Sequence, residues 1–440
     1  MTRDFLGQTL SLAQSESQGA VNDFVEGLLS CEERVVNVLQ IAANDTSPYV
    51  QACCAALHLF AESREGVRQA QPFVHAAQNS PIQPSSREAL FVRAVAAWGV
   101  GDIEESLRAF EQLLAENPRD LVSLKLAHYH QFNRGDSPGM LRLALASMPA
   151  ASDLAYQHGM TAFAWEQCHF LTQAETAARH ALALQAREPW AQHALAHVML
   201  TQGRIGEGAE FMRGVSPLWT GLNSFMQTHN WWHLALFELE RGDHQAALEL
   251  YDSQVWGIVK DYSQDQIGAV SLLARLELCG VDVGERWQDL ADHLVRREHD
   301  HLLPFLDMQY LYGMARAGRV EAEALMGSLQ EHAAQSASEV WTQVCLPASR
   351  GLLAHARGEH PTAVELLGLA LPQLIRIGGS HAQRDLFEQI YLDALLRSGQ
   401  RIAAQHLIQQ RVSQQPESER LARLSAQVLN ELGLPAQLAA

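Results

Sequence analysis

Residues 231–251 read WWHLALFELERGDHQAALELY and carry the pattern of two helices joined by a short turn. In the first half, Trp231, Leu234 and Ala235 follow one another at the three- and four-residue spacing of one helix face. Gly242 followed by Asp243 is typical of one helix that ends and another that is capped. These residues therefore predict a helix–turn–helix unit.

The same turn returns along the chain at a regular interval. The glycines are separated by 34 to 41 residues, apart from one double interval of 68 from Gly135 to Gly203, and the missing turn falls at His169. The glycine turns are Gly101-Asp102, Gly135-Asp136, Gly203-Arg204, Gly242-Asp243, Gly280-Val281, Gly318-Arg319, Gly358-Glu359 and Gly399-Gln400. A period of this length is typical of stacked helix–turn–helix repeats.

A small residue stands five positions after most of these turns, where it lets the second helix approach the first closely. The residues are Ser106, Ala174, Gly208, Ala247, Ala363 and Ala404. This is the tetratricopeptide pattern, and it is clear in GDIEESLRAFEQLLAENP, residues 101–118. We therefore expect an all-α, right-handed solenoid of about nine tetratricopeptide-like repeats that is strongly curled.

Composition agrees with a globular helical protein and excludes several classes of partner. The chain of 440 residues is 47% hydrophobic and 19% charged, and its formal net charge is −18. Such an excess of acidic groups argues against binding to nucleic acid or to anionic membranes. With no apolar run long enough for a membrane span and no secretory leader, we expect a cytoplasmic protein.

The first part of the chain lacks a clear repeat. We expect residues 1–85 to form an N-terminal helical cap and residues 86–440 to form one continuous repeat superhelix, with SPIQPSS (Ser80–Ser86) at the boundary. Because a solenoid exposes apolar surface at its end, a cap is a physical requirement.

Several segments resemble the tetratricopeptide repeat protein 38 family. They are GMTAFAWEQ (Gly159–Gln167), EPWAQHALAHVMLTQGR (Glu188–Arg204), HNWWHLALFELERGD (His229–Asp243), LYD (Leu250–Asp252) and GGSHAQRDLFEQ (Gly378–Gln389). The resemblance implies a fold and a pocket but no reaction. It also implies an acidic residue where this chain has Leu200, and a histidine in the segment where this chain has Asp307-Met308-Gln309.

Four histidines are predicted on the concave face of two neighbouring repeats. His193 and His197 are four residues apart, as are His229 and His233, so each pair lies on one side of its helix. Together they suit a divalent transition metal, with Glu166 as a further ligand or acid/base group. The alternative, which we favour from spacing alone, is a neutral polar pocket.

Other residues are predicted to line the same groove. Trp232 is expected to face it as a platform for a planar ligand, while Trp231 is expected to be buried. Lys125 offers a cation for a ligand carboxylate, and Asp307 and Gln309 flank the groove. For each of them, packing or solvation is the structural alternative.

The loop GGSHAQRD (Gly378–Asp385) precedes a predicted helix. Ser380 is placed to cap that helix, and an anion bound to the free N–H groups would also meet His381 and Arg384. The alternative is a capped helix start without a ligand.

These residues leave three classes of function open. The first is a binding protein whose concave His/Trp-lined pocket holds a small molecule or a peptide. The second is a metal-dependent enzyme with the four histidines and Glu166 as catalytic candidates, and the third is a protein-interaction scaffold. The chain has no P-loop, Rossmann glycine cluster or G-x-S-x-G motif, and both monomer and homodimer are compatible with it.

Overall fold

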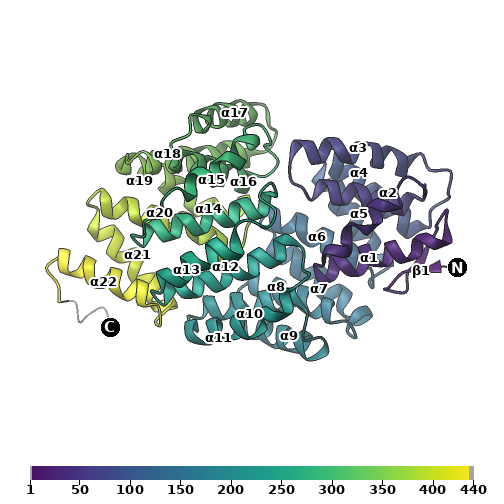
Figure 1. Cartoon of the computed structure of the whole chain (residues 1–440), viewed down its shortest axis with the longest axis horizontal. Coiled ribbons are helices and arrows are strands. Elements are labelled where there is room, and N and C mark those ends of the chain that lie inside the picture. Colours follow the sequence, from purple (N-terminus) through teal and green to yellow (C-terminus); the bar gives the residue numbers. More distant parts are fainter. Residues whose placement is uncertain (1, 436–440) are drawn as a thin grey trace. The chain divides into compact units, whose positions relative to one another are not determined.

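The computed structural model describes residues 2–435 and consists almost entirely of helices (Figure 1). The α-helices are α1 (Gln18–Ser30), α2 (Pro48–Leu59), α3 (Arg64–Gln78), α4 (Ser86–Gly99), α5 (Ile103–Glu116), α6 (Leu121–Asn133), α7 (Ser137–Ala151), α8 (Ala155–Gln167), α9 (Leu171–Leu184), α10 (Pro189–Thr201), α11 (Ile205–Val215), α12 (Ser224–Glu240), α13 (His244–Leu250), α14 (Ser263–Leu278), α15 (Arg286–Leu294), α16 (Pro304–Arg316), α17 (Glu321–Gln335), α18 (Leu346–Ala356), α19 (His360–Ala370), α20 (His381–Arg397), α21 (Arg401–Gln414) and α22 (Glu419–Glu431). The expected all-α solenoid of helix pairs is confirmed.

Shorter elements complete the chain. The 3₁₀ helices are η1 (Ser15–Ser17), η2 (Glu33–Gln40), η3 (Ser216–Trp219), η5 (Val295–Arg297) and η7 (Leu371–Ile377), and the π-helical turns are η4 (Tyr251–Val255) and η6 (Trp341–Cys345). Strands β1 (Thr2–Arg3) and β2 (Thr9–Leu10) pair antiparallel, with Thr2 opposite Leu10. Strands of two residues give no periodic signal, so the sequence did not predict them.

The predicted turns end helices as expected. All eight glycines of the repeat turns have positive φ, from +67° at Gly318 to +82° at Gly280. His169, in the double interval, also has a positive φ of 60°. The left-handed backbone that glycine adopts without strain is therefore used at each repeat, and one histidine adopts it in place of a glycine.

The small residues that follow the turns are buried between helices. Ser106, Ala174, Ala247, Ala363 and Ala404 are all fully buried. At Gly208 of α11, an added Cβ would meet the ring of Phe237 in α12 at 2.2 Å. The contact observed at Gly208 is with the first helix of the next repeat, and the predicted close approach within one repeat stays a prediction.

The chain forms two compact units. Unit 1 comprises Met1–Leu195 and Trp219–Met226, and unit 2 comprises Ala196–Leu218 and Gln227–Ala440. The division passes through α10 and α12, each of which begins in unit 1 and ends in unit 2. The expected boundary between a cap at 1–85 and repeats at 86–440 stays a prediction.

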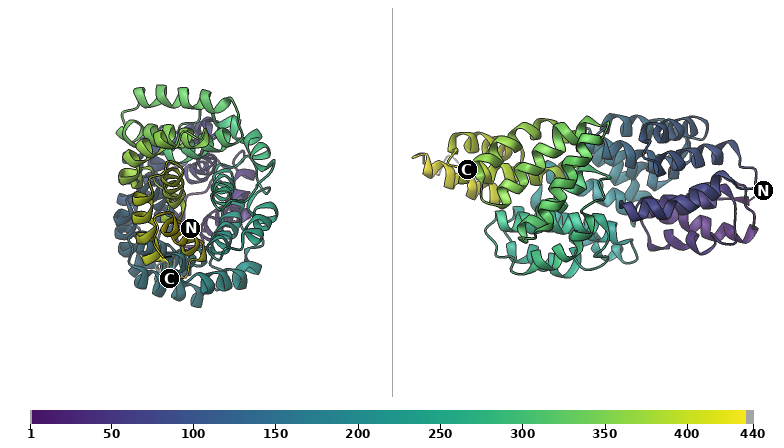
Figure 2. Two further views of the ribbon diagram at one scale, coloured as in Figure 1. Left: turned by 90° about the vertical axis from the view of Figure 1, so that its left-hand side faces the viewer. Right: turned by 90° about the horizontal axis from the view of Figure 1, so that it is seen from above.

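Unit 1 is held by a continuous apolar core from the N-terminal hairpin to α8. Its helices pair closely, as α2 with α3 and α8 with α9 (Figure 2). Within the core, Arg87 of α4 bonds Asp120 at 2.8 Å, and both side chains are at most 5% exposed. The core therefore contains an ion pair that is neutral as a whole, which is the form in which charge is tolerated in an apolar interior.

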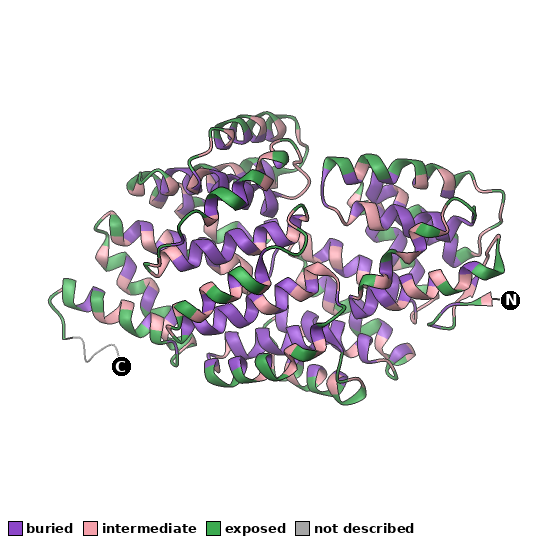
Figure 3. Ribbon diagram, viewed as in Figure 1, coloured by how far each residue is buried: buried purple, intermediate pink, exposed green. Residues whose placement is uncertain are grey.

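Unit 2 divides its helices into a buried and a half-exposed set (Figure 3). The first helices of its repeats, such as α14 and α16, are buried along most of their length. The second helices, such as α17 and α19, bury one face and expose the other. The first helices therefore form the interior of this unit.

The last repeat of unit 2 contacts its first. The loop between α21 and α22 lies against the end of α10, where Gln415 Nε2 donates to the carbonyl of Leu200 at 3.0 Å. Arg420 of α22 donates to Glu240 at the end of α12 at 2.7 Å, and the two ends are adjacent in Figure 1. Unit 2 therefore curls until it closes on itself. Among the described residues, no helix has the length and apolar character of a membrane span.

Candidate functional site

Three histidines meet in the interior of unit 2. His197 comes from α10, and His229 and His233 come from α12. The ring centroids of His197 and His233 are 4.5 Å apart, and those of His229 and His233 are 4.8 Å apart. Each of the three offers a nitrogen within 4.8 Å of the others. The predicted convergence of imidazoles from two helices is therefore present for these three residues.

The histidine cluster, as we call His197, His229 and His233, is almost completely removed from water. The exposed fractions are 1%, 9% and 0% respectively. Burial, together with the neighbouring His197, lowers the pKa of His229 to about 3. His229 is therefore a neutral imidazole at physiological pH, which is the form that binds metal ions.

The other predicted members of this site belong to unit 1. His193 precedes His197 by one helical turn on α10 and is 1% exposed. Glu166 of α8 is fully buried, and its carboxylate accepts from Gln167 Nε2 at 2.5 Å. Their roles as a metal ligand and as a ligand or acid/base group stay predictions.

Lys125 is engaged inside unit 1. Its Nζ donates to the carbonyl of Leu29 at 3.2 Å and lies 3.2 Å from Cys31 Sγ. It also lies 5.3 Å from the centroid of the Trp190 ring, where its charge meets the aromatic face. These contacts support the structural interpretation of Lys125, and no ligand is needed to explain its position.

The two adjacent tryptophans have the reverse of the expected exposure. Trp232 is 1% exposed, whereas Trp231 is partly exposed. Trp232 stacks on His229 at 5.2 Å with the ring planes 11° apart, and the guanidinium of Arg275 lies 5.5 Å from its ring centroid. The physical reason is that α14 of the next repeat covers this face of α12 with Arg275. The sequence pattern of one repeat does not show that cover.

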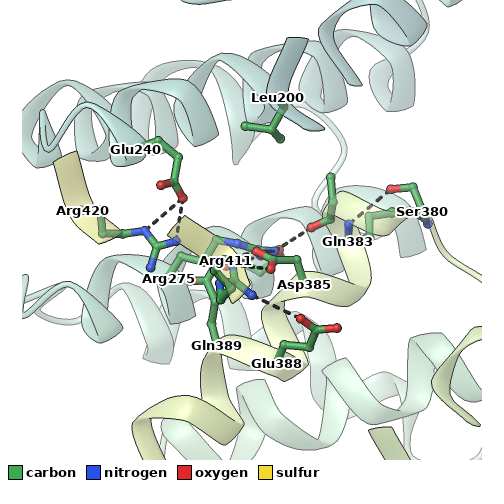
Figure 4. A network of polar contacts seen from close by, with 12 residues as sticks. Leu200, Glu240, Arg275, Ser380, Gln383, Asp385, Glu388, Gln389, Arg411 and Arg420 are labelled. Carbon is green, nitrogen blue, oxygen red and sulfur yellow. Dashed lines mark hydrogen bonds and ion pairs between the residues drawn. The ribbon is translucent and has the colours of Figure 1, made fainter. Parts of the chain in front are cut away.

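Arg275 leads into a buried network of charged side chains (Figure 4). It lies 3.9 Å from Asp385 of α20, which also pairs with Arg411 of α21 at 2.5 Å. Burial would raise the pKa of the Asp385 carboxyl, but Arg411 and Arg275 outweigh that effect and hold the pKa below its usual range. Desolvation lowers the pKa of Arg275 to about 10, so it remains charged at neutral pH.

Leu200 borders this network, where the family resemblance implies an acidic residue (Figure 4). Its side chain adds no charge and is 8% exposed. The arginines of the network are therefore balanced by other elements, Asp385 and Glu388 on α20 and Glu240 on α12. In this chain the network cross-links helices from four different repeats.

Polar groups of the Gly378–Asp385 loop form hydrogen bonds with one another. Ser380 accepts from the Gln383 backbone N–H at 3.2 Å, and the Gln383 side chain accepts from the Ser380 N–H at 2.9 Å, which forms a capping box. Arg384 donates to the carbonyls of Gly378 and Gly379 and lies 3.3 Å from His381. These bonds support the capped helix start, and the predicted ligand role of Ser380, His381 and Arg384 stays a prediction.

Asp307 and Gln309 of α16 are buried, at 1% and 2% exposure. Gln309 donates to the Phe305 carbonyl at 3.3 Å. Asp307 binds His301, which the sequence analysis did not single out. The short sequence separation of His301 and Asp307 was visible, but a histidine six residues before an aspartate forms no recognised motif, and only the loop before α16 brings them together.

A further histidine group was also missed. His355 of α18, His360 of α19 and Asp393 of α20 offer ligand atoms within 4.8 Å of one another. However, both ring nitrogens of His355 already have partners, Asp393 at 2.9 Å and the Tyr312 hydroxyl at 3.1 Å. This group is therefore a hydrogen-bonded link between three helices.

Comparisons with known proteins relate the chain to others only distantly. No protein-family model matches it. It is similar to a structure of the human IFIT1 dimer with PPP-AAAA, with 13% identity and a TM-score of 0.42 over 92% of this chain and 95% of that chain. It is also similar to a structure of Naa15/Naa10 bound to HypK-THB, with 14% identity and a TM-score of 0.26 over 79% of this chain and 61% of that chain. At TM-scores below 0.5, neither similarity indicates what this chain binds.

Proposed function

We propose that this helical-repeat protein binds a divalent transition-metal ion through the histidine cluster in the interior of unit 2. The observation that carries the proposal is the convergence of His197, His229 and His233, whose ligand nitrogens lie within 4.8 Å of one another. Imidazole nitrogen is a borderline ligand that suits zinc, copper, iron and nickel. Membership of the tetratricopeptide repeat protein 38 family is part of the same proposal.

The burial of the cluster favours a small ligand. A peptide bound in a groove needs exposed side chains to contact, whereas these histidines are at most 9% exposed. The excess of acidic residues, with a net charge of −18, also disfavours nucleic acid as a partner. An ion requires little space in such an interior.

The spacing of the nitrogens is compatible with coordination after a small adjustment. Two nitrogens on one tetrahedral zinc ion, each about 2.0–2.1 Å from the metal, lie about 3.3 Å apart. The nitrogens of the cluster lie within 4.8 Å, so rotations of the imidazole rings about their side-chain bonds bring them to that separation. His193, one turn before His197 on α10, and Glu166 remain the candidates for further ligands.

Binding is the function that these observations support, and catalysis would add to it. A metal-dependent reaction would use the ion as a Lewis acid or as the source of a bound hydroxide. The histidines would then be ligands, and an acid/base group such as Glu166 would be needed beside them.

A small polar molecule in the interior of unit 2 is the second candidate ligand. On α12, the Nε1 of Trp232 and both polar atoms of the Asn230 side chain are buried without a hydrogen-bond partner among the described residues. Leaving such atoms unsatisfied costs about 1–3 kcal/mol each, and a bound polar molecule would remove that cost. Native mass spectrometry of the purified protein, compared with a Trp232→Phe variant, tests this candidate.

Zinc binding is tested on the full chain by gel filtration after incubation with Zn²⁺, followed by elemental analysis. The wild type should retain about one equivalent of zinc. The His197→Ala/His233→Ala variant should retain less than about a tenth of that, because two of three imidazole ligands are lost.

The matched control is His158→Ala/His180→Ala in unit 1. These two rings are also close, with centroids 4.3 Å apart, but they lie near the surface. The control should keep full zinc retention. Equal zinc retention in the wild type and in the cluster variant would reject the proposal.

A further inference from the structure

Three polar side chains of unit 2 form a hydrogen-bonded chain outside the histidine cluster. His301 precedes α16, Asp307 lies in the first turn of α16, and Ser328 lies in α17. His301 Nδ1 is 2.6 Å from Asp307 Oδ2, and His301 Nε2 is 2.5 Å from Ser328 Oγ. With the Nδ1 proton directed at the carboxylate, Nε2 is the acceptor for the Ser328 hydroxyl proton.

We propose that Ser328 is a nucleophile, activated by His301 and oriented through Asp307, that accepts an acyl group from small esters. The order hydroxyl, imidazole, carboxylate is the arrangement that makes a serine reactive, and it is recognised by geometry and not by sequence order. His301 is the general base, and Asp307 is a positioning residue that acts through it.

The proposed reaction is a two-step ester hydrolysis. Ser328 Oγ bonds to the ester carbonyl carbon while its proton moves to His301 Nε2, and the carbon–alkoxide bond then breaks as that proton passes to the leaving alcohol. Water next attacks the acyl-serine, gives its proton to His301, and releases the carboxylic acid as Ser328 regains its proton. The net reaction consumes one water molecule and needs no oxidant or reductant.

The surroundings of Asp307 agree with a positioning role. Its side chain is 1% exposed. Burial raises its pKa to about 6, which the bond from His301 limits, so the carboxylate is ionised at neutral pH. A buried anion directed at one imidazole nitrogen fixes the tautomer that general-base action requires.

His301 is held in an uncommon backbone conformation. Its φ is +45°, in the left-handed region that residues other than glycine seldom adopt. Such strain persists only where the surrounding structure fixes it, and it is found preferentially at functional sites. The rings of His332 and Trp341 enclose this side, with His332 stacked on His301 at 5.0 Å and 4.5 Å from Trp341.

The position of Ser328 also limits the rate expected for its acylation. It lies in the interior of α17 and is half-buried, so an electrophile reaches it, but the nearby backbone N–H groups are used by the helix. The ring of His299 also lies beside the hydroxyl, with Nδ1 2.9 Å from Ser328 Oγ, and its protonated tautomer would supply one donor. Loss of one oxyanion donor costs about 10²–10³-fold in other serine enzymes, so we expect slow acylation that covalent labelling detects more readily than turnover.

The test is labelling of the full chain with an alkyl fluorophosphonate, followed by peptide mass spectrometry. The wild type should be labelled at Ser328, and Ser328→Ala should not be labelled there. Asp307→Asn should slow labelling by roughly 10²–10⁴-fold, the usual contribution of general-base catalysis, and should alter the pH profile of the labelling rate.

Three further variants keep the result interpretable. Ser328→Cys retains a nucleophile, so its alkylation by iodoacetamide should be faster than that of Ser328→Cys/Asp307→Asn, even if Ser328→Ala folds poorly. His158→Ala/His180→Ala should label normally, because this pair lies near the surface of unit 1 and belongs to neither site. Labelling that avoids Ser328, or that is unchanged by Asp307→Asn, would overturn the proposal.

Discussion

Unit 2 contains two groups of histidines that differ in what their rings contact. In the histidine cluster of α10 and α12, imidazoles pack on imidazoles and on Trp232. In the second group, His301 lies between a carboxylate and a hydroxyl. The same residue type therefore serves different chemistry: nitrogens that converge on one point suit an ion, whereas nitrogens between an acid and an alcohol suit proton transfer.

Burial alone does not identify a site in this protein. Both groups are largely removed from water. What separates them is the arrangement around the rings, because His301 lies between a carboxylate and a hydroxyl whereas the rings of the cluster pack against one another. The two sites should therefore respond independently to changes in packing, pH and capping.

The largest expected effect is that of Gly208→Ala, which should disrupt the histidine cluster and leave the His301 group intact. An added Cβ on α11 would meet the Phe237 ring of α12 at 2.2 Å, and α12 carries His229 and His233. We expect a loss of about 3 kcal/mol in the free energy of unfolding, at the upper end of the range for overpacking a core. Urea denaturation measures it, and zinc retention should fall while Ser328 labelling persists.

The matched control is Gly206→Ala on the same helix. Its Cβ would meet no atom within 4 Å. Because alanine favours a helix over glycine, this variant should gain about 0.5–1 kcal/mol. A similar loss in both variants would show that α11 tolerates no side chain, and the specific contact with Phe237 would not be the cause.

A pH series distinguishes the two groups, because the pKa of His229 is lowered in the folded protein and the pKa of Asp307 is raised. The pKa of His229 is lowered from 6.5 to about 3, so its neutral form is favoured on folding. The associated stability is present above pH 6.5 and is lost as the pH falls towards 3. The expected loss from pH 6.5 to 4.5 is about 2–3 kcal/mol, since each pKa unit corresponds to about 1.4 kcal/mol.

The pKa of Asp307 is shifted in the opposite direction to that of His229. Its pKa is raised from 3.8 to about 6, so the stability it contributes is present below pH 3.8 and is lost as the pH rises through 6. Urea unfolding between pH 4 and 7.5 should therefore show a shallower acid loss in His229→Gln than in the wild type, and a steeper one in Asp307→Asn. Identical pH profiles for the three proteins would contradict both assignments.

The smallest expected effect is that of Ser380→Ala. This change removes the cap of α20 and should cost about 1 kcal/mol in thermal or urea unfolding. Ser85→Ala, which removes the equivalent capping box of α4, should cost about the same. If Ser380 also served a ligand at either histidine group, Ser380→Ala would change zinc retention or labelling, and Ser85→Ala would not.

The repeat architecture was predictable because it depends on local signals. A glycine with positive φ ends the first helix of a unit and a small residue follows it five positions later, so their spacing is visible in the chain. Even the turn without glycine, at His169, was placed correctly from the interval alone.

The sites were only partly predictable, because their contacts come from different repeats. The i, i+4 spacing within α12 placed His229 and His233 on one side of the helix. It did not reveal that Arg275 covers Trp232, since Arg275 lies more than 40 residues further along the chain. Ser328 was missed for the same reason, because its 27-residue separation from His301 carries no motif and depends on how α17 packs beside the loop before α16.

The contact between the last and first repeats of unit 2 has a consequence for how this unit comes apart. An open array of repeats frays from its ends, because a terminal repeat has only one neighbour. Here Arg420 and Gln415 tie the terminal repeat to Glu240 and to the end of α10, so that repeat has two neighbours. Amide hydrogens of α21 and α22 should therefore exchange at rates close to those of central helices, and opening should be a cooperative event of the whole unit.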